Sequence, residues 1–290
     1  MKTNISGFTI VRNAELLDYP LKESILSVLP ICDEFVINCG KSTDGTEKIC
    51  EEIKSLHPEK IRVIYSEWKT DNQTGGFQLK SQTDAALKAC TGDWCFYIQA
   101  DEVVHEEDLP KIILAKSKAQ NLQHIDGVLF DYLHFYGNFS YTIEGRNWYR
   151  KEVRLFKNRR GIQAFRDAQG FRKNGERLLV VPSQARIFHY GYVRSSESLK
   201  KKSTEMARWW GSKVDESPEN FELINHVGLK FFKKTHPLLM KARVQEKNFP
   251  FNPKQCRRKW DKNEIKNALT LAWESIFPFR IGEYRNYEVV

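Results

Sequence analysis

The first hundred residues alternate short apolar runs with longer segments whose apolar positions recur every three or four residues. The runs predict strands at 8–11, 34–37, 61–65 and 94–98, and the helical spacing predicts helices at 15–29, 46–56 and 78–89. Strands that alternate with helices in this way are typical of a parallel sheet covered by helices on both faces. The pattern therefore predicts an α/β fold for this part of the chain.

The pattern changes after residue 107. It predicts a helix at 109–119, strands at 126–136, 153–156 and 185–188, and helices at 198–210, 220–234 and 263–276. We expect a first domain at 1–195, with a nucleotide-sugar half at 1–107 and an acceptor half at 108–195. A helical region rich in basic and aromatic residues, 196–290, then follows as a C-terminal extension.

Charge and cysteine content narrow the class of protein. The formal net charge is +9, and the excess of Lys and Arg builds from Arg146 onward. No RNA-recognition or zinc-finger spacing accompanies it, so a solvated basic face is favoured over a nucleic-acid site. The six cysteines show no metal-binding spacing and are expected to be reduced. With no long apolar segment and no signal-like N-terminus, we expect a cytoplasmic protein, with possible peripheral contact to a membrane.

Two consecutive acidic residues, Asp101 and Glu102, come at the end of the apolar run 94–98. In open α/β sheets, ligands bind beyond the carboxyl ends of the strands. Carboxylate oxygens suit Mg²⁺ and Mn²⁺. This segment therefore predicts a site for a metal and a phosphorylated substrate, with a solvated turn as the alternative.

Three further segments could contribute to such a site. The stretch 38–46 is rich in Gly, Ser and Thr and joins a strand to a helix, although an ordinary well-capped turn would look the same. Lys80 and Asp84 share one helical face, where an ion pair is the simpler interpretation. His189 ends a strand and could complete a metal site, although a lone histidine is more often a core residue.

Taken in order, short motifs along the first 210 residues point to one family. They are Val11-Arg12-Asn13, Asn38-Cys39-Gly40 followed by Ser42-Thr43-Asp44-Gly45-Thr46, Lys88 to Trp94, Gln99-Ala100-Asp101, Arg154 to Asn158, and His189-Tyr190-Gly191. Together they resemble inverting glycosyltransferases of family 2, which have the GT-A fold. The chain departs from that pattern at Gln99 and Asn38, where the family has acids, and at the inserted Lys41.

The resemblance implies a mixed, mostly parallel sheet flanked by helices and an enzyme that transfers a hexose-like sugar. It implies a divalent cation, Mn²⁺ or Mg²⁺, bound by Asp101 and His189. Asp167 is the expected catalytic base, with Glu102 and Glu152 as alternatives. The residues expected to bind the nucleotide-sugar are Val11, Arg12, Asn13, Asn38, Gly40, Ser42, Asp44, Lys80, Gln82, Gln99 and Ala100.

The same resemblance implies the partners. The donor is a nucleotide-sugar, with UDP the commonest nucleotide, and the acceptor is a glycan or lipid-linked sugar in surface glycan synthesis. No nucleic acid is expected. The alternatives are a nucleotidyltransferase of related fold, for which the segment after the first strand has too little glycine, and a basic nucleic-acid-binding module.

Overall fold

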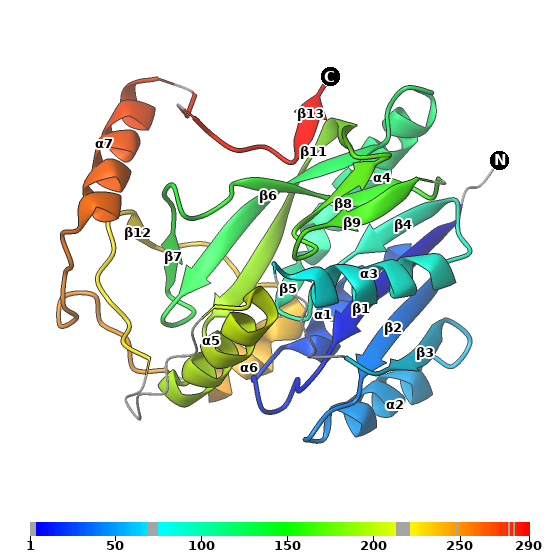
Figure 1. Ribbon diagram of the computed structural model, residues 1–290, viewed down its shortest axis with the longest axis horizontal. Coiled ribbons are helices and arrows are strands. Elements are labelled where there is room, and N and C mark those ends of the chain that lie inside the picture. Colours follow the sequence, from blue (N-terminus) through cyan, green and yellow to red (C-terminus); the bar gives the residue numbers. More distant parts are fainter. Residues whose placement is uncertain are drawn as a thin grey trace.

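The computed structural model describes residues 4–68, 75–159, 161–212, 221–247, 249–277, 279–280 and 282–290. Within them one mixed sheet runs in the order β3-β2-β1-β4-β8-β6-β11-β10-β9, with β5 and β13 on β11 and the pair β7–β12 beside β6. Figure 1 shows the sheet as the centre of the molecule, with helices on both of its sides.

The N-terminal half is the predicted parallel sheet. Its elements are β1 (Ile5–Val11), α1 (Leu21–Val28), the short 3-10 helix η1 (Leu29–Ile31), β2 (Glu34–Gly40), α2 (Thr46–Leu56), β3 (Ile61–Ser66), α3 (Phe77–Ala89) and β4 (Trp94–Tyr97). β1 pairs in parallel with both β2 and β4, and β2 pairs in parallel with β3. The carboxyl ends of these strands therefore meet at one edge.

The second half adds mainly antiparallel pairings. Its elements are β5 (Glu102–Val104), η2 (Glu106–Asp108), α4 (Leu109–Gln120), β6 (Gly127–Tyr136), β7 (Tyr141–Ile143), β8 (Lys151–Lys157), β9 (Ile162–Phe165), β10 (Gly170–Lys173) and β11 (Glu176–Tyr192). β4 and β6 both pair antiparallel with β8, whereas β6 and β11 run parallel. The sheet is therefore mixed, as predicted.

The C-terminal region contains α5 (Ser196–Trp210), β12 (Leu229–Phe231), η3 (Leu238–Met240), α6 (Lys241–Glu246), α7 (Lys262–Ile276) and β13 (Tyr287–Val289). β13 returns to pair with β11, and α7 stands at the far edge of the molecule from α2 (Figure 1). The division of the chain at residue 195 stays a prediction.

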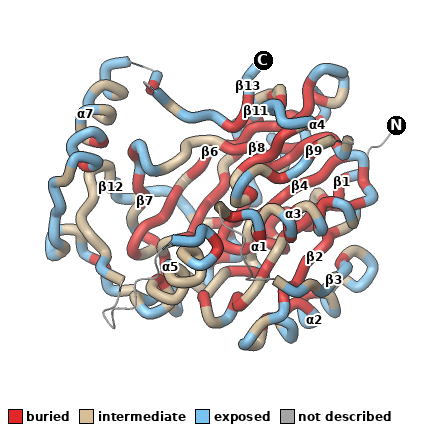
Figure 2. Tube along the Cα trace, viewed as in Figure 1, coloured by how far each residue is buried: buried red, intermediate tan, exposed pale blue. Residues whose placement is uncertain are grey.

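Alternation along the strands explains the two layers of core. In β4, Trp94 and Phe96 pack with residues of α1, α2 and α4, whereas Cys95 and Tyr97 pack with residues of α3. Side chains of a strand alternate between the faces of a sheet, so both faces are apolar and both are covered. Figure 2 shows this as nearly continuous burial along the central strands.

One predicted helix is wrong in part and another is wrong throughout the described residues. The helix expected at 15–29 begins only at Leu21, because Pro20 precedes it and Asn13 and Asp18 adopt left-handed φ values of 53°. The helix expected at 220–234 is absent from the described residues 221–234, which form an extended segment ending in β12. There Leu229–Phe231 pair with β7, and that pairing replaces the helical hydrogen bonds.

Candidate functional site

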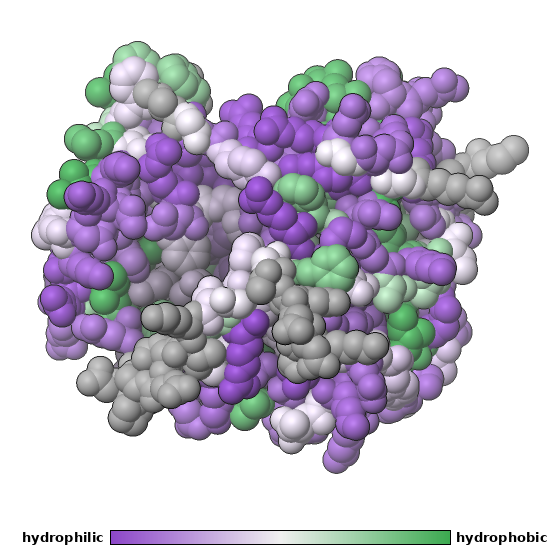
Figure 3. Space-filling model, in the orientation of Figure 1, coloured by the Kyte–Doolittle hydropathy of each residue, from purple (hydrophilic) through white to green (hydrophobic). Residues whose placement is uncertain are grey.

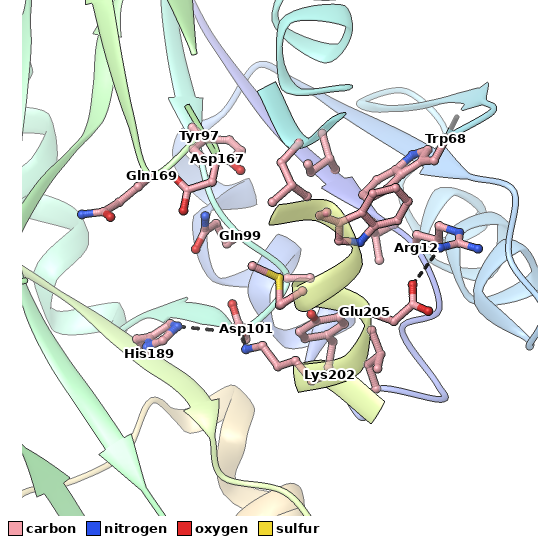
Figure 4. A pocket seen from close by; sticks show the side chains of 18 of the residues that line it. Arg12, Trp68, Tyr97, Gln99, Asp101, Asp167, Gln169, His189, Lys202 and Glu205 are labelled. Atoms are coloured by element: carbon pink, nitrogen blue, oxygen red, sulfur yellow. Dashed lines mark hydrogen bonds and ion pairs between the residues drawn. The ribbon is translucent and has the colours of Figure 1, made fainter. Parts of the chain in front are cut away.

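A cavity of about 220 Å³ opens at the carboxyl edge of β1 and β4. Its wall includes the end of β1, the turn that follows β4, the turn between β9 and β10, His189 of β11 and one face of α5. Figure 4 shows side chains from these separate elements pointing into the same space. This is where ligands bind in open α/β sheets.

Asp101 lies in this wall, directly after the turn that ends β4, as the sequence predicted. Its Oδ2 accepts a hydrogen bond from Lys202 Nζ at 2.8 Å. Arg194 Nη2 lies 3.6 Å and His189 Nε2 3.8 Å from the same oxygen. Although burial disfavours the charged form, Lys202, His189 and Arg194 together hold the pKa of Asp101 well below its usual range.

Histidine 189 is held by a chain of hydrogen bonds that determines which nitrogen carries its proton. His134 Nε2 lies 2.7 Å from the carbonyl oxygen of Tyr149, which can only accept, so this nitrogen carries the hydrogen. Burial lowers the pKa of His134 to about 4, so its Nδ1 is a bare acceptor at neutral pH. His189 Nδ1 lies 2.9 Å from that atom and must donate. The lone pair of His189 Nε2 therefore faces Asp101.

Asp101 and His189 fit a divalent cation. A carboxylate oxygen and an imidazole lone pair 3.8 Å apart are both acceptors, and an acceptor pair of this kind suits a cation between them. Gly191 keeps the space open, since a Cβ there would lie 2.4 Å from His189 Cε1 and 3.3 Å from Asp101 Oδ2. Within the described ranges no three acidic, His or Cys side chains gather to hold a metal unaided. Diphosphate oxygens and water would complete the shell.

Asp167, the predicted base, also lines the cavity. It lies in the tight turn between β9 and β10, flanked by Arg166 and Ala168 with left-handed φ values of 54° and 61°. Gly76, which precedes α3, backs this turn, because a Cβ there would lie 2.6 Å from the Asp167 Cβ. Non-glycine residues held at positive φ concentrate at functional sites. Burial raises the pKa of Asp167, which suits a proton acceptor near neutral pH.

The two alternative bases lie outside the cavity lining. Glu102 is fully buried and accepts a bidentate pair from Arg154 at 2.8 and 2.9 Å, together with the Tyr132 hydroxyl at 2.7 Å. Glu152 is buried behind Gln169, whose amide donates to it at 2.6 Å, and burial raises its pKa to about 7. This geometry favours Asp167 over both.

The predicted nucleotide-sugar residues separate into two groups. The cavity wall contains Val11, Arg12, Gln99 and Ala100, together with the metal and base candidates Asp101, His189 and Asp167. The structure places the other predicted residues outside this wall, namely Asn13, Asn38, Gly40, Ser42, Asp44, Lys80 and Gln82. Their part in binding stays a prediction.

Contacts within the second group support the loop rather than the cavity. Asn38 is fully buried, and its amide donates to Gln82 Oε1 at 3.0 Å and to Gln82 O at 2.8 Å. Asp44 accepts from the backbone N of Thr46, the first residue of α2, at 3.0 Å. Lys80 pairs with Asp84 at 2.5 Å. These side chains are engaged with neighbouring residues of the fold, and none of them lines the cavity.

Helix α5 supplies wall residues that the sequence analysis did not assign to the site. Lys202, Glu205, Met206 and Trp209 line the cavity at the spacing of one helical face. Glu205 pairs with Arg12 at 2.9 Å, and the Trp209 ring lies 5.5 Å from that of Trp68. The helical spacing of these four residues can be read from the sequence, but the sequence does not show that this face of α5 packs against the cavity. Tyr19, Tyr97, Tyr149 and Gln169 were also missed.

Comparison with protein families decides the class. The model of glycosyl transferase family 2 matches residues 20–173, which is more than half of the chain and includes Asp101 and Asp167. The chain belongs to glycosyl transferase family 2. It is therefore a member of a glycosyltransferase family, and its α/β sheet is the GT-A fold expected for that family. His189 and α5 lie beyond the matched segment of family 2.

Comparison with curated proteins found no match. Solved structures similar to this family 2 chain include a mannosyltransferase from Pyrobaculum calidifontis in complex with GDP-Man and Mn²⁺, at 17% identity and a TM-score of 0.34, over 44% of this chain and 35% of that one. TarS from S. aureus is 14% identical with a TM-score of 0.41, and the match covers 70% of this chain and 39% of TarS. Glucosyl-3-phosphoglycerate synthase from Mycobacterium tuberculosis, in complex with Mn²⁺, UDP-glucose and phosphoglyceric acid, is 21% identical with a TM-score of 0.33. That match covers 45% of this chain and 44% of the synthase. The chain thus spans less than half the length of these three proteins.

Proposed function

We propose that the chain transfers a sugar from a nucleotide-diphosphate sugar, UDP-linked, to an acceptor hydroxyl with inversion at the anomeric carbon, in the synthesis of a surface glycan. One observation carries the proposal. A single cavity is lined by Asp101 and His189, whose acceptor atoms lie 3.8 Å apart and could bind a cation. Another part of the same wall contains Asp167, a carboxylate whose pKa is raised. These are the two groups that glycosyl transfer from a diphosphate requires.

On the donor side, Asp101 and His189 would hold Mn²⁺ or Mg²⁺, which when bound neutralises charge that develops on the leaving diphosphate. Lys202 and Arg12 also face the cavity and can hydrogen-bond phosphate oxygens. In the described structure Lys202 pairs with Asp101 and Arg12 with Glu205, so each would exchange a carboxylate for a phosphate. The aromatic rings of Trp68 and Trp209 form an apolar wall that suits a nucleobase.

On the acceptor side, Asp167 would remove the proton from the attacking hydroxyl. A second cavity of about 250 Å³ shares Tyr149 and Gln169 with the first and adds the rings of Trp148 and Tyr284. Aromatic rings pack well against sugar faces. Two of its arginines are paired with acids, Arg150 with Glu283 at 2.7 Å and Arg280 with Glu274 at 2.5 Å, which favours an uncharged part of a glycan or lipid-linked sugar.

Six free cysteines, five of them buried, support our proposal that the enzyme works in the reducing cytoplasm.

Nucleotide binding tests the donor site. UDP, GDP and CDP are titrated into the full chain with and without Mn²⁺, by calorimetry and thermal shift. We expect one nucleoside diphosphate to bind at least about tenfold more tightly with Mn²⁺, and Asp101→Asn to abolish that gain. Asp131→Asn, at a half-exposed aspartate paired with Lys151, is the matched control. The proposal would be contradicted if nucleotide affinity changed neither on addition of Mn²⁺ nor in Asp101→Asn.

Turnover of the identified donor tests the base. Asp167→Asn is expected to lower kcat on the order of 10² to 10⁴-fold while nucleotide affinity stays unchanged, because the general base acts in the transition state. Glu102→Gln and Glu152→Gln are compared at temperatures where each variant is folded. If Asp167→Asn retains full activity, the base has been assigned to the wrong residue.

A further inference from the structure

Helix α7 turns three polar residues toward the body of the molecule. Glu264 and Asn267 are both buried, and they face the body of the molecule together with Glu274. Glu264 accepts from Val227 N at 3.0 Å and lies 2.5 Å from His226 Nδ1. Asn267 accepts from Arg146 N at 2.8 Å and donates to Val227 O at 3.1 Å. The helix is therefore attached to the molecule by hydrogen bonds.

The opposite face of α7 is apolar and exposed. Ile265, Leu269 and Ile276 are 48%, 67% and 75% exposed and follow the spacing of one helical face. A surface helix of a water-soluble protein normally turns such a face inward. At the end of α7 the stripe continues into Phe277 and Phe279, which are exposed as well. Figure 3 shows hydrophobic surface at the upper left of the view, where Figure 1 places α7.

Positive charge gathers at the start of the same helix. Six basic residues between positions 254 and 266 are exposed, and they are Lys254, Arg257, Arg258, Lys259, Lys262 and Lys266. The same stretch contains two acids. Asp261 caps α7 by accepting from Asn263 N and Glu264 N and lies 3.7 Å from Lys259 Nζ, so it offsets one of these cations, and Glu264 faces inward. Trp260 is 58% exposed beside this charge, with the Arg258 guanidinium 5.6 Å from its ring.

We propose that the surface formed by Trp260 and the outward face of α7 docks on an anionic phospholipid surface. An exposed apolar stripe flanked by Lys and Arg, with a Trp at its edge, matches a helix that lies in the plane of a membrane interface. Lys262 and Lys266 would meet the headgroups while Leu269 enters the acyl boundary. Among the described helices none is long and apolar enough to cross a bilayer. This docking is independent of the proposed sugar transfer.

Charge complementarity favours lipid over a second copy of the chain. A symmetric dimer through this face would bring the same patch of each copy together. Six exposed cations from each copy would then lie at one interface, where like charges repel. An anionic surface neutralises these charges. The same face of α7 is therefore better suited to phospholipid.

Flotation with vesicles tests the proposal. The full chain is mixed with vesicles of phosphatidylcholine alone, or of equal parts phosphatidylcholine and phosphatidylglycerol. We expect it to float only with the anionic vesicles and to be released by salt. Leu269→Glu is expected to weaken binding on the order of tenfold, and Lys266→Glu by more than roughly fivefold. Matched controls are Leu114→Glu on α4, where the leucine is 57% exposed, and Lys48→Glu on α2, and neither changes binding.

Several results would overturn the proposal. One is no flotation with anionic vesicles, and another is equal flotation with neutral ones. A third is unchanged binding by Lys266→Glu, which alters an exposed position and so remains informative if Leu269→Glu fails to fold. A concentration-dependent dimer in sedimentation velocity, lost in Leu269→Glu while vesicles are not bound, would assign this face to a second copy. Nucleotide binding is measured in parallel, so failure of the donor site is distinguished from failure of docking.

Discussion

Helices α5 and α7 look alike in the sequence and differ in what their inward faces do. Each has 15 residues with basic and aromatic side chains, and each turns charged groups inward. In α5 the inward charges, Lys202 and Glu205, pair with Asp101 and Arg12 in the wall of a cavity. In α7 the inward Glu264 pairs with a loop that lines neither described cavity. Glu274 of the same helix pairs instead with Arg280 and Arg150, which line the second cavity. A buried charge is therefore a candidate for function only where it or its partner lies against a cavity.

Between the two helices, the largest expected effect is that of Lys202→Met in α5. Removing this ammonium takes from the cavity a cation that can contact the diphosphate, so kcat/KM should fall on the order of a hundredfold. Mn²⁺ should bind more tightly without nucleotide, because the amine no longer competes for Asp101. Calorimetry and steady-state kinetics measure both changes. Lys201→Met, at the neighbouring half-exposed lysine paired with Glu197, is the control. Loss of Mn²⁺ binding in Lys202→Met would contradict the assignment.

His134 is buried and contacts His189 without lining the cavity itself. Substituting it tests whether a residue outside the lining affects metal binding. His134→Leu removes the acceptor that fixes the proton of His189, and we expect Mn²⁺ affinity to fall about 10- to 100-fold. His134→Asn keeps an acceptor near the same position and should retain most of the affinity. Nitrogen NMR of the metal-free protein should show the His189 proton on Nδ1. A proton on Nε2 in the wild type would refute the hydrogen-bond chain.

Glu264 tests the other helix. Glu264→Leu leaves Val227 N and His226 without their partner, so the free energy of unfolding should fall by about 1 to 3 kcal/mol. Activity below the melting temperature should stay that of the wild type. Ile265→Ala, on the outward face, should change stability by less than about 0.5 kcal/mol. Chemical denaturation measures both. If Glu264→Leu lowers kcat without lowering the free energy of unfolding, α7 contributes to activity as α5 is proposed to do.

Glu152 is a buried acid that lines neither described cavity and accepts hydrogen bonds from the amides of Gln169 and Asn286. Burial raises its pKa from 4.5 to about 7, so the folded state binds its proton more tightly than the unfolded state. This group therefore lowers stability as pH rises from 4.5 to 7, by at most about 1.4 kcal/mol for each pH unit. Glu152→Gln should remove that slope, measured as unfolding free energy against pH. An unchanged slope would mean that Glu152 is ionised throughout.

Much of the parallel half could be predicted because its signals are local. The apolar runs and helical spacings of residues 34–98 predicted β2, α2, β3, α3 and β4 to within a few residues. The start of α1 was wrong because Pro20 and the left-handed Asn13 and Asp18 override its helical spacing. The helix expected at 220–234 was wrong because β7 offered Leu229–Phe231 a strand partner. Pairing between distant segments leaves no periodic trace in either one.

The sequence by itself determined the alternation of strands and helices, the family, and the acid placed after β4, because each depends on a few consecutive residues. Only the tertiary structure decided which of those residues share a cavity. It brought α5 to Asp101 across about a hundred positions of chain and turned the polar side of α7 inward. The physical reason is that a buried charge must find a partner, and that partner can lie anywhere along the chain.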